Sequence, residues 1–137
     1  MKRIYDSSAL VNIILNKGSK ALFVLSGHVT LDLATYEIGN SVWKMSCLRK
    51  DITKDEARNL LDVCVKTMSK MKIVTACGIE KDISKMAFDT KCSYYDSAYL
   101  TIAQKHRLEL ITDDMSLQKI AAKCGIRVSD SELDPAN

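Results

Sequence analysis

The stretch RIYDSSALVNII, residues 3–14, places a strand, a helix start and an acidic side chain next to one another. Its first three residues predict a short strand. Asp6, Ser7 and Ser8 supply side chains that cap helices, and the apolar residues after them recur at helical spacing. Asp6 is therefore predicted to lie where a strand ends and a helix begins.

The same alternation continues along the rest of the chain. Further strands are predicted at 28–31, 72–75 and 109–112, with an edge strand at 126–128. Helices are predicted at 20–25, 33–49, 53–70, 79–90, 94–106 and 114–124; Thr53 begins a capping box, and Gly125 follows the last helix. Alternating strands and helices are typical of an α/β domain with a parallel sheet. We expect one domain over residues 1–137, with a polar tail at about 129–137.

The composition is that of a soluble globular domain, with 137 residues, 47% hydrophobic and 27% charged. The uninterrupted apolar runs are short, so we expect no membrane span. Met1-Lys2-Arg3 leads directly into the first strand without the apolar region of a signal peptide, which favours a cytoplasmic protein. A net charge of +3 permits a nucleic-acid partner without requiring one.

Neither the cysteines nor the histidines form a metal-binding or redox motif. The five cysteines contain no CxxC pair, which argues against a zinc ribbon or a thioredoxin-like site. We expect them to be reduced and mostly buried, with a disulfide left open for a hyperthermophilic source. His28 and His106 are far apart and are expected to be structural or exposed. The cysteines are Cys47, Cys64, Cys77, Cys92 and Cys124.

Four acidic residues stand out by their positions. Asp6 and Asp114 follow predicted strands, Asp96 opens a predicted helix, and Glu37 lies in a helix with Asn40 three residues later on the same face. Each has a structural explanation when taken alone. An aspartate at a helix start is usually an N-cap, and a glutamate within a helix is usually solvated.

Taken together, the four acids predict a site. Ligands of open parallel sheets bind beyond the carboxyl ends of the strands, so these side chains are expected to converge there. Neighbouring carboxylates repel one another unless they share protons or bind a cation. Oxygen ligands suit Mg²⁺ or Mn²⁺, which polarise a phosphoryl oxygen and activate water. Phosphodiester hydrolysis at such a site needs no histidine or cysteine nucleophile.

Four motifs in order carry a family resemblance: IYDSSAL (residues 4–10), EIGN (37–40), YDSAY (95–99) and ITDDMSL (111–117). From residue 3 to about 128, the chain resembles the PIN domain, and most of all the VapC-type ribonuclease toxins. The resemblance implies a three-layer α/β/α sandwich around a central parallel sheet. It also implies an Mg²⁺- or Mn²⁺-dependent endoribonuclease that cuts single-stranded or looped RNA. Such toxins are usually homodimers and are neutralised by a small antitoxin protein.

Carried over by position, the resemblance assigns metal-binding and catalytic roles to Asp6, Glu37, Asp96 and Asp114. The family pattern Thr-x-Asp selects Asp114, with Asp113 kept as an alternative or additional ligand. The set of supporting residues consists of Ser8, Asn40 and Thr112.

Several interpretations stay open at this stage. A non-catalytic PIN scaffold that binds RNA or a partner protein is the main alternative, and a structure-specific DNA nuclease is disfavoured because the chain has no inserted arch. Tyr95 is a candidate for stacking on bases. Two clusters have both a structural and a functional interpretation: the lysines Lys66, Lys70 and Lys72 (solvated face or RNA contact), and the apolar residues Leu60, Leu61, Val63, Cys64 and Met68 (core or dimer interface).

Overall fold

A computed structural model of the chain describes residues 2–132. Its centre is a parallel sheet of five strands in the order β3-β2-β1-β4-β5. The strands are β1 (Arg3–Tyr5), β2 (Val29–Leu31), β3 (Lys72–Val74), β4 (Glu109–Ile111) and β5 (Val128–Ser129). The predicted parallel sheet is thus confirmed, with the first strand in the middle.

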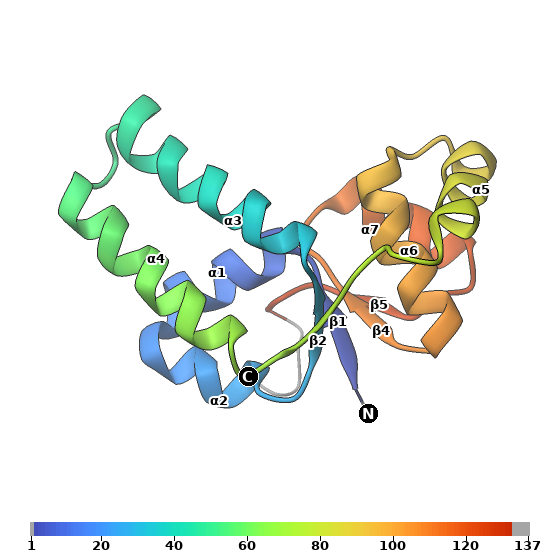
Figure 1. Cartoon of the computed structure of the whole chain (residues 1–137), viewed down its shortest axis with the longest axis horizontal. Helices are drawn as coiled ribbons and strands as arrows, with labels where there is room; N and C mark the ends of the chain where they lie inside the picture. Colours follow the sequence, from blue (N-terminus) through green and yellow to red (C-terminus); the bar gives the residue numbers. More distant parts are fainter. Residues whose placement is uncertain (1, 133–137) are drawn as a thin grey trace.

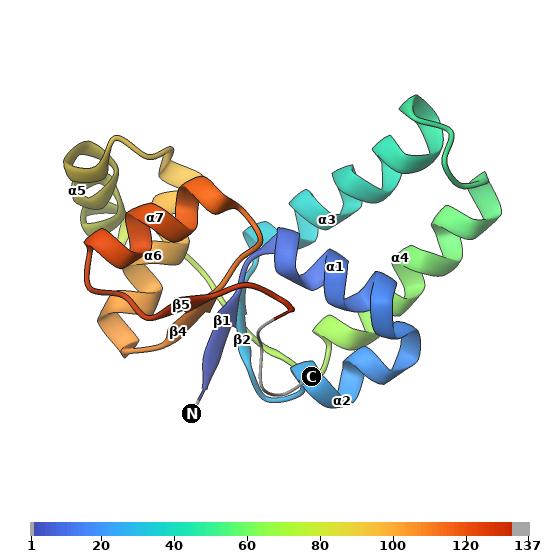
Figure 2. The ribbon, with the colours of Figure 1, turned by 180° about the vertical axis from the view of Figure 1, so that it is seen from behind.

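Helices cover both faces of the sheet (Figures 1 and 2). One face carries α1 (Ser7–Lys17), α2 (Ala21–Leu25), α3 (Leu33–Trp43) and α4 (Lys54–Met68), and the other carries α5 (Glu80–Thr90), α6 (Tyr94–His106) and α7 (Met115–Lys123). Successive strand residues alternate between the two cores, as the two-residue period of a strand requires. Tyr5 and Ile111 pack with the first group of helices, whereas Ile4 and Leu110 pack with the second. The expected three-layer α/β/α sandwich is therefore confirmed.

The N-terminal helical stretch Ser7–Leu25 is long and apolar enough, by length and composition alone, to span a membrane. The sequence alone predicts no stretch that could span a membrane, because the uninterrupted apolar runs are short. Apolar residues of a helix need not be contiguous in sequence, so short runs do not exclude a long apolar helix. In the structure a 3₁₀ turn at Gly18–Lys20 interrupts the stretch, and Leu10, Ile13 and Ile14 are buried in the first core. Burial in this core accounts for part of its apolar character.

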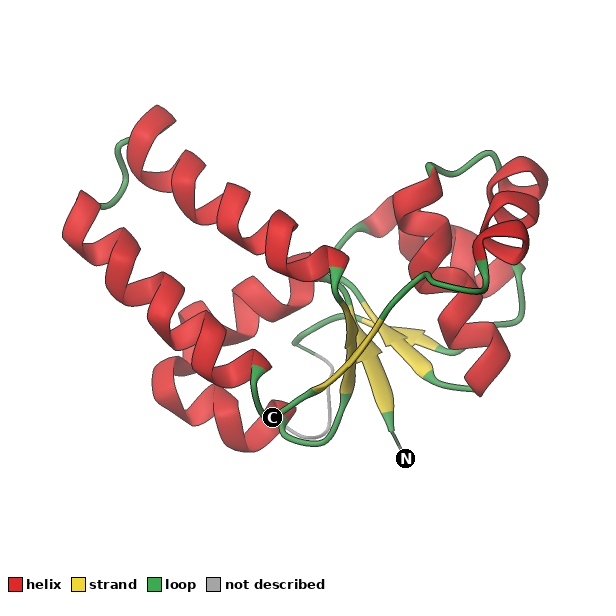
Figure 3. Ribbon diagram, in the orientation of Figure 1, coloured by secondary structure: helices red, strands yellow, loops and turns green. Residues whose placement is uncertain are grey.

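Helices α3 and α4 form an arm that extends from the sheet (Figures 1 and 3). The α-helix predicted to continue to residue 49 ends at Trp43, and a π-helical turn, Lys44–Leu48, follows it. The predicted capping box at the start of α4 is present, with both Thr53–Glu56 hydrogen bonds formed.

The apolar residues proposed for either the core or a dimer interface belong mostly to the core. Cys64 and Met68 are buried, and Leu60 and Val63 pack partly against the same core. Leu61 is the one member of this set that is exposed.

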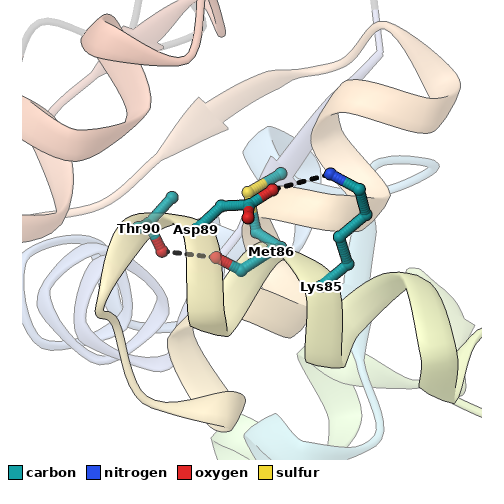
Figure 4. A network of polar contacts seen from close by, with 4 residues as sticks. All are labelled: Lys85, Met86, Asp89 and Thr90. Atoms are coloured by element: carbon teal, nitrogen blue, oxygen red, sulfur yellow. Dashed lines mark hydrogen bonds and ion pairs between the residues drawn. The ribbon is translucent and has the colours of Figure 1, made fainter.

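The second half of the chain packs around α6. Exposed ion pairs link Lys85 to Asp89 (2.7 Å) along α5 and Lys105 to Asp82 (3.6 Å) between α6 and α5. The Thr90 hydroxyl donates to a main-chain oxygen one turn earlier in α5 (Figure 4). A cavity of about 770 Å³ lies between α5, α6 and α7. None of the four acids lines it.

The C-terminal end of the described chain is better ordered than a polar tail. Gly125 follows α7 with φ +73°, as predicted for a glycine that ends a helix. Ser129 belongs to β5, and Ser131 is buried, so neither belongs to a solvated tail. The remainder of the predicted tail, 133–137, lies outside the described residues.

All five cysteines are free in the described part of the chain. Cys64 is buried, and Cys92 and Cys124 are partly buried. The expectation of burial is wrong for Cys47 and Cys77, because they lie in the π-helical turn of the arm and in the loop after β3.

Candidate active site

The carboxyl-end edge of the sheet brings together the starts of several helices. The helices α1, α3 and α7 directly follow β1, β2 and β4. Helix α6 instead precedes β4, so its C-terminus lies at the amino end of that strand and its N-terminus lies at the carboxyl-end edge. Each of these four helix starts contributes one acid: Asp6, Glu37, Asp96 and Asp114. The topology thus places all four predicted site acids at one edge.

Asp6 is the most deeply buried of the four, with 6% of its surface exposed. One carboxylate oxygen, Oδ1, accepts hydrogen bonds from the Ala9 amide (3.0 Å) and the Ser8 hydroxyl (2.7 Å). The other oxygen, Oδ2, accepts a hydrogen bond from the Thr112 hydroxyl. Burial nevertheless raises the pKa of Asp6 to about 6, with a smaller contribution from the charge of Glu37. Asp6 is therefore both the N-cap of α1 and a carboxylate that resists ionisation.

Glu37 is held by two residues that the sequence did not single out. The Tyr99 hydroxyl donates to Glu37 Oε1 at 3.0 Å, and the neighbouring Ser7 side chain acts to lower the pKa of the same carboxylate. Burial is the main cause that raises the pKa of Glu37, and the charge of Asp96 adds to it. Tyr99 is only 1% exposed, and burial followed by the charge of Glu37 raises its pKa far above the usual value. The phenol therefore stays protonated and acts as a donor.

Asp96 is not the residue that caps its helix. Ser93 is the N-cap of α6, since its hydroxyl accepts from the Asp96 amide at 3.1 Å, and Asp96 is the third residue of the helix. This leaves the Asp96 side chain without the capping role that was its structural explanation. Burial is the largest cause of its raised pKa, followed by the charge of Asp114.

Asp114 does cap α7. Its Oδ1 accepts from the amides of Ser116 (2.9 Å) and Leu117 (3.2 Å), and the residue itself is exposed. Its own amide donates to the Thr112 hydroxyl at 3.1 Å, so the same threonine contacts both Asp6 and Asp114.

The acids influence one another in a chain of neighbours. Glu37 raises the pKa of Asp6, Asp96 raises that of Glu37, and Asp114 raises that of Asp96. Within residues 2–132 no ion pair joins any of them to a basic side chain. No three described acidic, histidine or cysteine side chains lie close enough, in these orientations, to hold a metal ion jointly. The edge therefore carries negative charge that no ion pair among residues 2–132 neutralises.

Asp113, the alternative fourth acid, is engaged elsewhere. Its Oδ1 accepts from the Ser131 amide (2.8 Å), and its Oδ2 accepts from the Ser131 hydroxyl (2.7 Å) and from Asn12 Nδ2 (2.6 Å). These bonds fasten the segment after β5 to the α1 side of the site. These contacts could not be predicted from the sequence, because Asn12, Asp113 and Ser131 are far apart along the chain and only the fold brings them together.

Of the remaining predicted residues, Ser8 and His28 form hydrogen bonds, whereas Asn40 and Tyr95 are exposed. Ser8 contacts Asp6 and also accepts from the Asp113 amide (3.1 Å), whereas Asn40 is exposed on α3. Tyr95 is exposed and stands beside Asp96, so it remains available for stacking. His28 accepts from the Arg3 amide at 3.1 Å and its ring meets Tyr5 edge-on, which is a structural role.

The lysine cluster lies away from the acids. Lys72 is the first residue of β3, and Lys66 and Lys70 are exposed where α4 leads into that strand. This is the amino-end edge of the sheet, whereas the acids occupy the opposite edge. The position of these lysines at the edge opposite the acids favours the solvated-face interpretation over an RNA contact near the acids.

Comparison with known proteins agrees with this architecture. Ribonuclease VapC3 of Pyrobaculum aerophilum is 30% identical over 122 residues, which cover 85% of this chain and 92% of the relative. The chain belongs to the VapC family of PIN-domain proteins. A second VapC relative, Exonuclease VapC9 of the same organism, is 26% identical over 110 residues, 72% of this chain and 79% of its own.

A solved structure shares the VapC fold seen here. The crystal structure of PAE2754 from Pyrobaculum aerophilum superposes with a TM-score of 0.79, covering 96% of this chain and 90% of that one at 22% identity. No family model matches the chain.

Proposed function

We propose that this VapC-family chain is a divalent-metal-dependent endoribonuclease that hydrolyses phosphodiester bonds in single-stranded or looped RNA. The carrying observation is the set of four mutually coupled carboxylates at one sheet edge, with no basic partner among the described residues. Two VapC relatives named as a ribonuclease and an exonuclease support a nuclease.

The chemistry of the donors fits Mg²⁺ or Mn²⁺. The four groups offer carboxylate oxygens only, and burial without a cation raises the pKa of three of them. Asp6, Asp96 and Asp114 would be the principal ligands, with Glu37 as a further ligand or as the group that orients water. When bound, the cation polarises the phosphoryl oxygen and lowers the pKa of water.

The chain's own residues prepare these carboxylates. Ser8 and Thr112 hold Asp6 in one orientation through both of its oxygens. Tyr99 fixes Glu37, whose raised pKa suits it to accept a proton from an attacking water.

The test is the rate of RNA cleavage by Asp6→Asn in Mg²⁺ or Mn²⁺. We expect a loss of ~10²-fold or more, as for removal of one charge-stabilising group at an active site. The matched control is Asp55→Asn, the same change at an exposed acid of α4. A circular RNA as substrate separates internal cleavage from the end-cleavage that the name of VapC9 describes. Cleavage by Asp6→Asn at the unaltered rate would contradict the mechanism.

One observation favours the alternative of a non-catalytic scaffold that binds RNA or a partner protein. No three described side chains converge at metal-binding distance in these orientations. Titration with Mn²⁺ by calorimetry decides between the two. Binding that Asp96→Asn abolishes supports the nuclease, and no detectable binding at millimolar Mn²⁺ supports the scaffold.

We further propose that the protein is a single cytoplasmic domain, the toxin of a toxin–antitoxin pair, neutralised by a small antitoxin, and a homodimer. The VapC relatives support the toxin role. Exposed apolar side chains on the arm provide a surface for a protein partner; they are Tyr36, Trp43, Leu48, Leu61 and Val65. Light scattering that finds only monomer at high concentration would rule out the homodimer. Co-purification with the product of a short adjacent reading frame tests the antitoxin.

A further inference from the structure

A second cavity adjoins the acids and belongs to none of the roles described so far. It measures about 550 Å³ and is lined by Asn12 and Asn16 of α1, by Met115 and Gln118 of α7, and by Asp113 with the segment after β5. Met115 directly follows Asp114, and the amide of Asp113 donates to the hydroxyl of Ser8, which supports Asp6. A group bound here would therefore lie next to Asp114 and to the serine that supports Asp6.

The lining excludes a phosphate. Among the described residues, no lysine, arginine or histidine lines the cavity, whereas Asp113, Asp130 and Glu132 do. Carboxylates repel the RNA backbone, and phosphate binding needs cations or free amides. The cavity instead suits an uncharged group with hydrogen-bond donors.

Two amide side chains present acceptors in a fixed orientation. Gln118 Nε2 donates to the Thr112 carbonyl oxygen at 2.8 Å, and Asn12 Nδ2 donates to Asp113 Oδ2 at 2.6 Å. Neither partner can donate, so the amide nitrogens must face them. The carbonyl oxygens Gln118 Oε1 and Asn12 Oδ1 are thus left to accept from a ligand.

An apolar surface completes the cavity. Met115 is 69% exposed, although a methionine side chain gains by covering apolar or aromatic surface. A flat ring packed against its sulfur would place its polar edge toward the amides. Amides that read a base edge beside an apolar contact for its face form a recurrent pattern in nucleic-acid recognition.

We propose that this cavity is a nucleobase subsite, which receives a base flanking the scissile phosphate and prefers adenine, cytosine or guanine to uracil. The three preferred bases carry an exocyclic amino group, whose two hydrogens can donate to the two amide oxygens. Uracil offers only its N3–H donor, and the carbonyl oxygens on either side of that donor would face the acidic lining. The proposal rests on the proposed RNA cleavage and adds a base preference to it.

The test uses a single-stranded RNA pool with randomised positions, cleaved in Mn²⁺, with the cut ends sequenced. We expect uracil to be depleted at one position flanking the cut by about threefold to tenfold, the range that one hydrogen bond supplies. Gln118→Ala and Asn12→Ala, which each remove one of the two amide oxygens, should reduce the depletion to less than about twofold, on the same scale. The matched control is Gln104→Ala, which removes a glutamine lining the other cavity and should keep the depletion.

The outcomes separate the two proposals. Equal use of all four bases around the cut by the unmodified protein would overturn the subsite while leaving the nuclease intact. Depletion that survives in both Gln118→Ala and Asn12→Ala would do the same. A pool without cut ends would overturn the nuclease, and the subsite with it. Thermal unfolding of each variant, compared with the unmodified chain, confirms that a lost preference does not reflect a lost fold.

Discussion

Neutralising Asp6 should stabilise the metal-free protein at neutral pH. Folding raises the pKa of Asp6 from 3.8 to about 6, so the folded state favours the protonated form. At 1.36 kcal/mol per pKa unit, ionisation of Asp6 at pH 7.5 costs the fold ~3 kcal/mol. Asp6→Asn removes this cost while its side-chain oxygen can still accept from the Ala9 amide. We expect a gain of about 1–3 kcal/mol, the lower values reflecting imperfect replacement of the hydrogen bond from Thr112.

The pH dependence identifies the cause. A carboxyl group whose pKa is raised by folding destabilises the protein as soon as the pH is high enough to ionise that group in the unfolded chain. The penalty is therefore almost absent near pH 4, grows as pH rises toward 6, and is complete above the folded-state pKa. The advantage of Asp6→Asn over the unmodified chain should follow the same course.

Urea denaturation in EDTA at pH 4 and pH 7.5 measures this difference, with Asp55→Asn as the control for loss of an exposed charge. Added Mg²⁺ should stabilise the unmodified chain and narrow the gap, because a ligand that binds only the folded state stabilises it. An advantage of Asp6→Asn that is the same at both pH values would refute the reasoning, since it would not arise from ionisation of Asp6.

Three further predictions follow from individual contacts. Tyr99→Phe removes only the donor to Glu37 and should lower kcat by about tenfold to a hundredfold, because one hydrogen bond to a charged group contributes about 1.5–3 kcal/mol; an unchanged kcat in steady-state cleavage assays would show that catalysis does not need the Tyr99 hydrogen bond to Glu37. Asp114→Asn should abolish cleavage, whereas Asp113→Asn should retain it and lose about 1–3 kcal/mol of stability in urea because its bonds to Ser131 weaken; the reverse pattern would make Asp113 the fourth acid. Thr53→Ala should destabilise the fold by about 1 kcal/mol through loss of the α4 cap, with cleavage unaffected. Calorimetric melting measures the loss of stability, and the RNA assay measures the rate of cleavage.

Much of the fold could be predicted because its signals are local. Short apolar runs, capping side chains and a terminal glycine are each contained within a few residues, and the capping box at Thr53 and the glycine at Gly125 were found in this way. No comparable local pattern predicts the change from α-helix to π-helix at Lys44. The apolar spacing used to predict a helix up to residue 49 does not distinguish the two kinds of helix.

The site was predictable to the extent that it follows the order of strand ends. The interpretation of Asp6 and Asp114 as helix caps is confirmed. Both residues also lie at the shared edge, so capping a helix is compatible with the proposed role as site acids. For Asp96 the cap interpretation was wrong, and Ser93, three residues earlier, was the local signal that identifies the cap. The Tyr99–Glu37 contact spans 62 residues and depends on the complete fold, so no short pattern reveals it.

The central position of β1 governs when the site can exist during synthesis. Asp6 lies near the beginning of the chain, yet its Thr112 partner follows 106 residues later, after β4 has inserted beside β1. Chains emerge from the ribosome N-terminus first, and a central strand whose neighbour is still missing has no complete edge. A nascent or truncated chain that stops before β4 therefore carries Asp6, Glu37 and Asp96 without the threonine that orients the first of them. For a chain with the proposed ribonuclease activity, this order of assembly means that the complete site forms only after β4 has been synthesised.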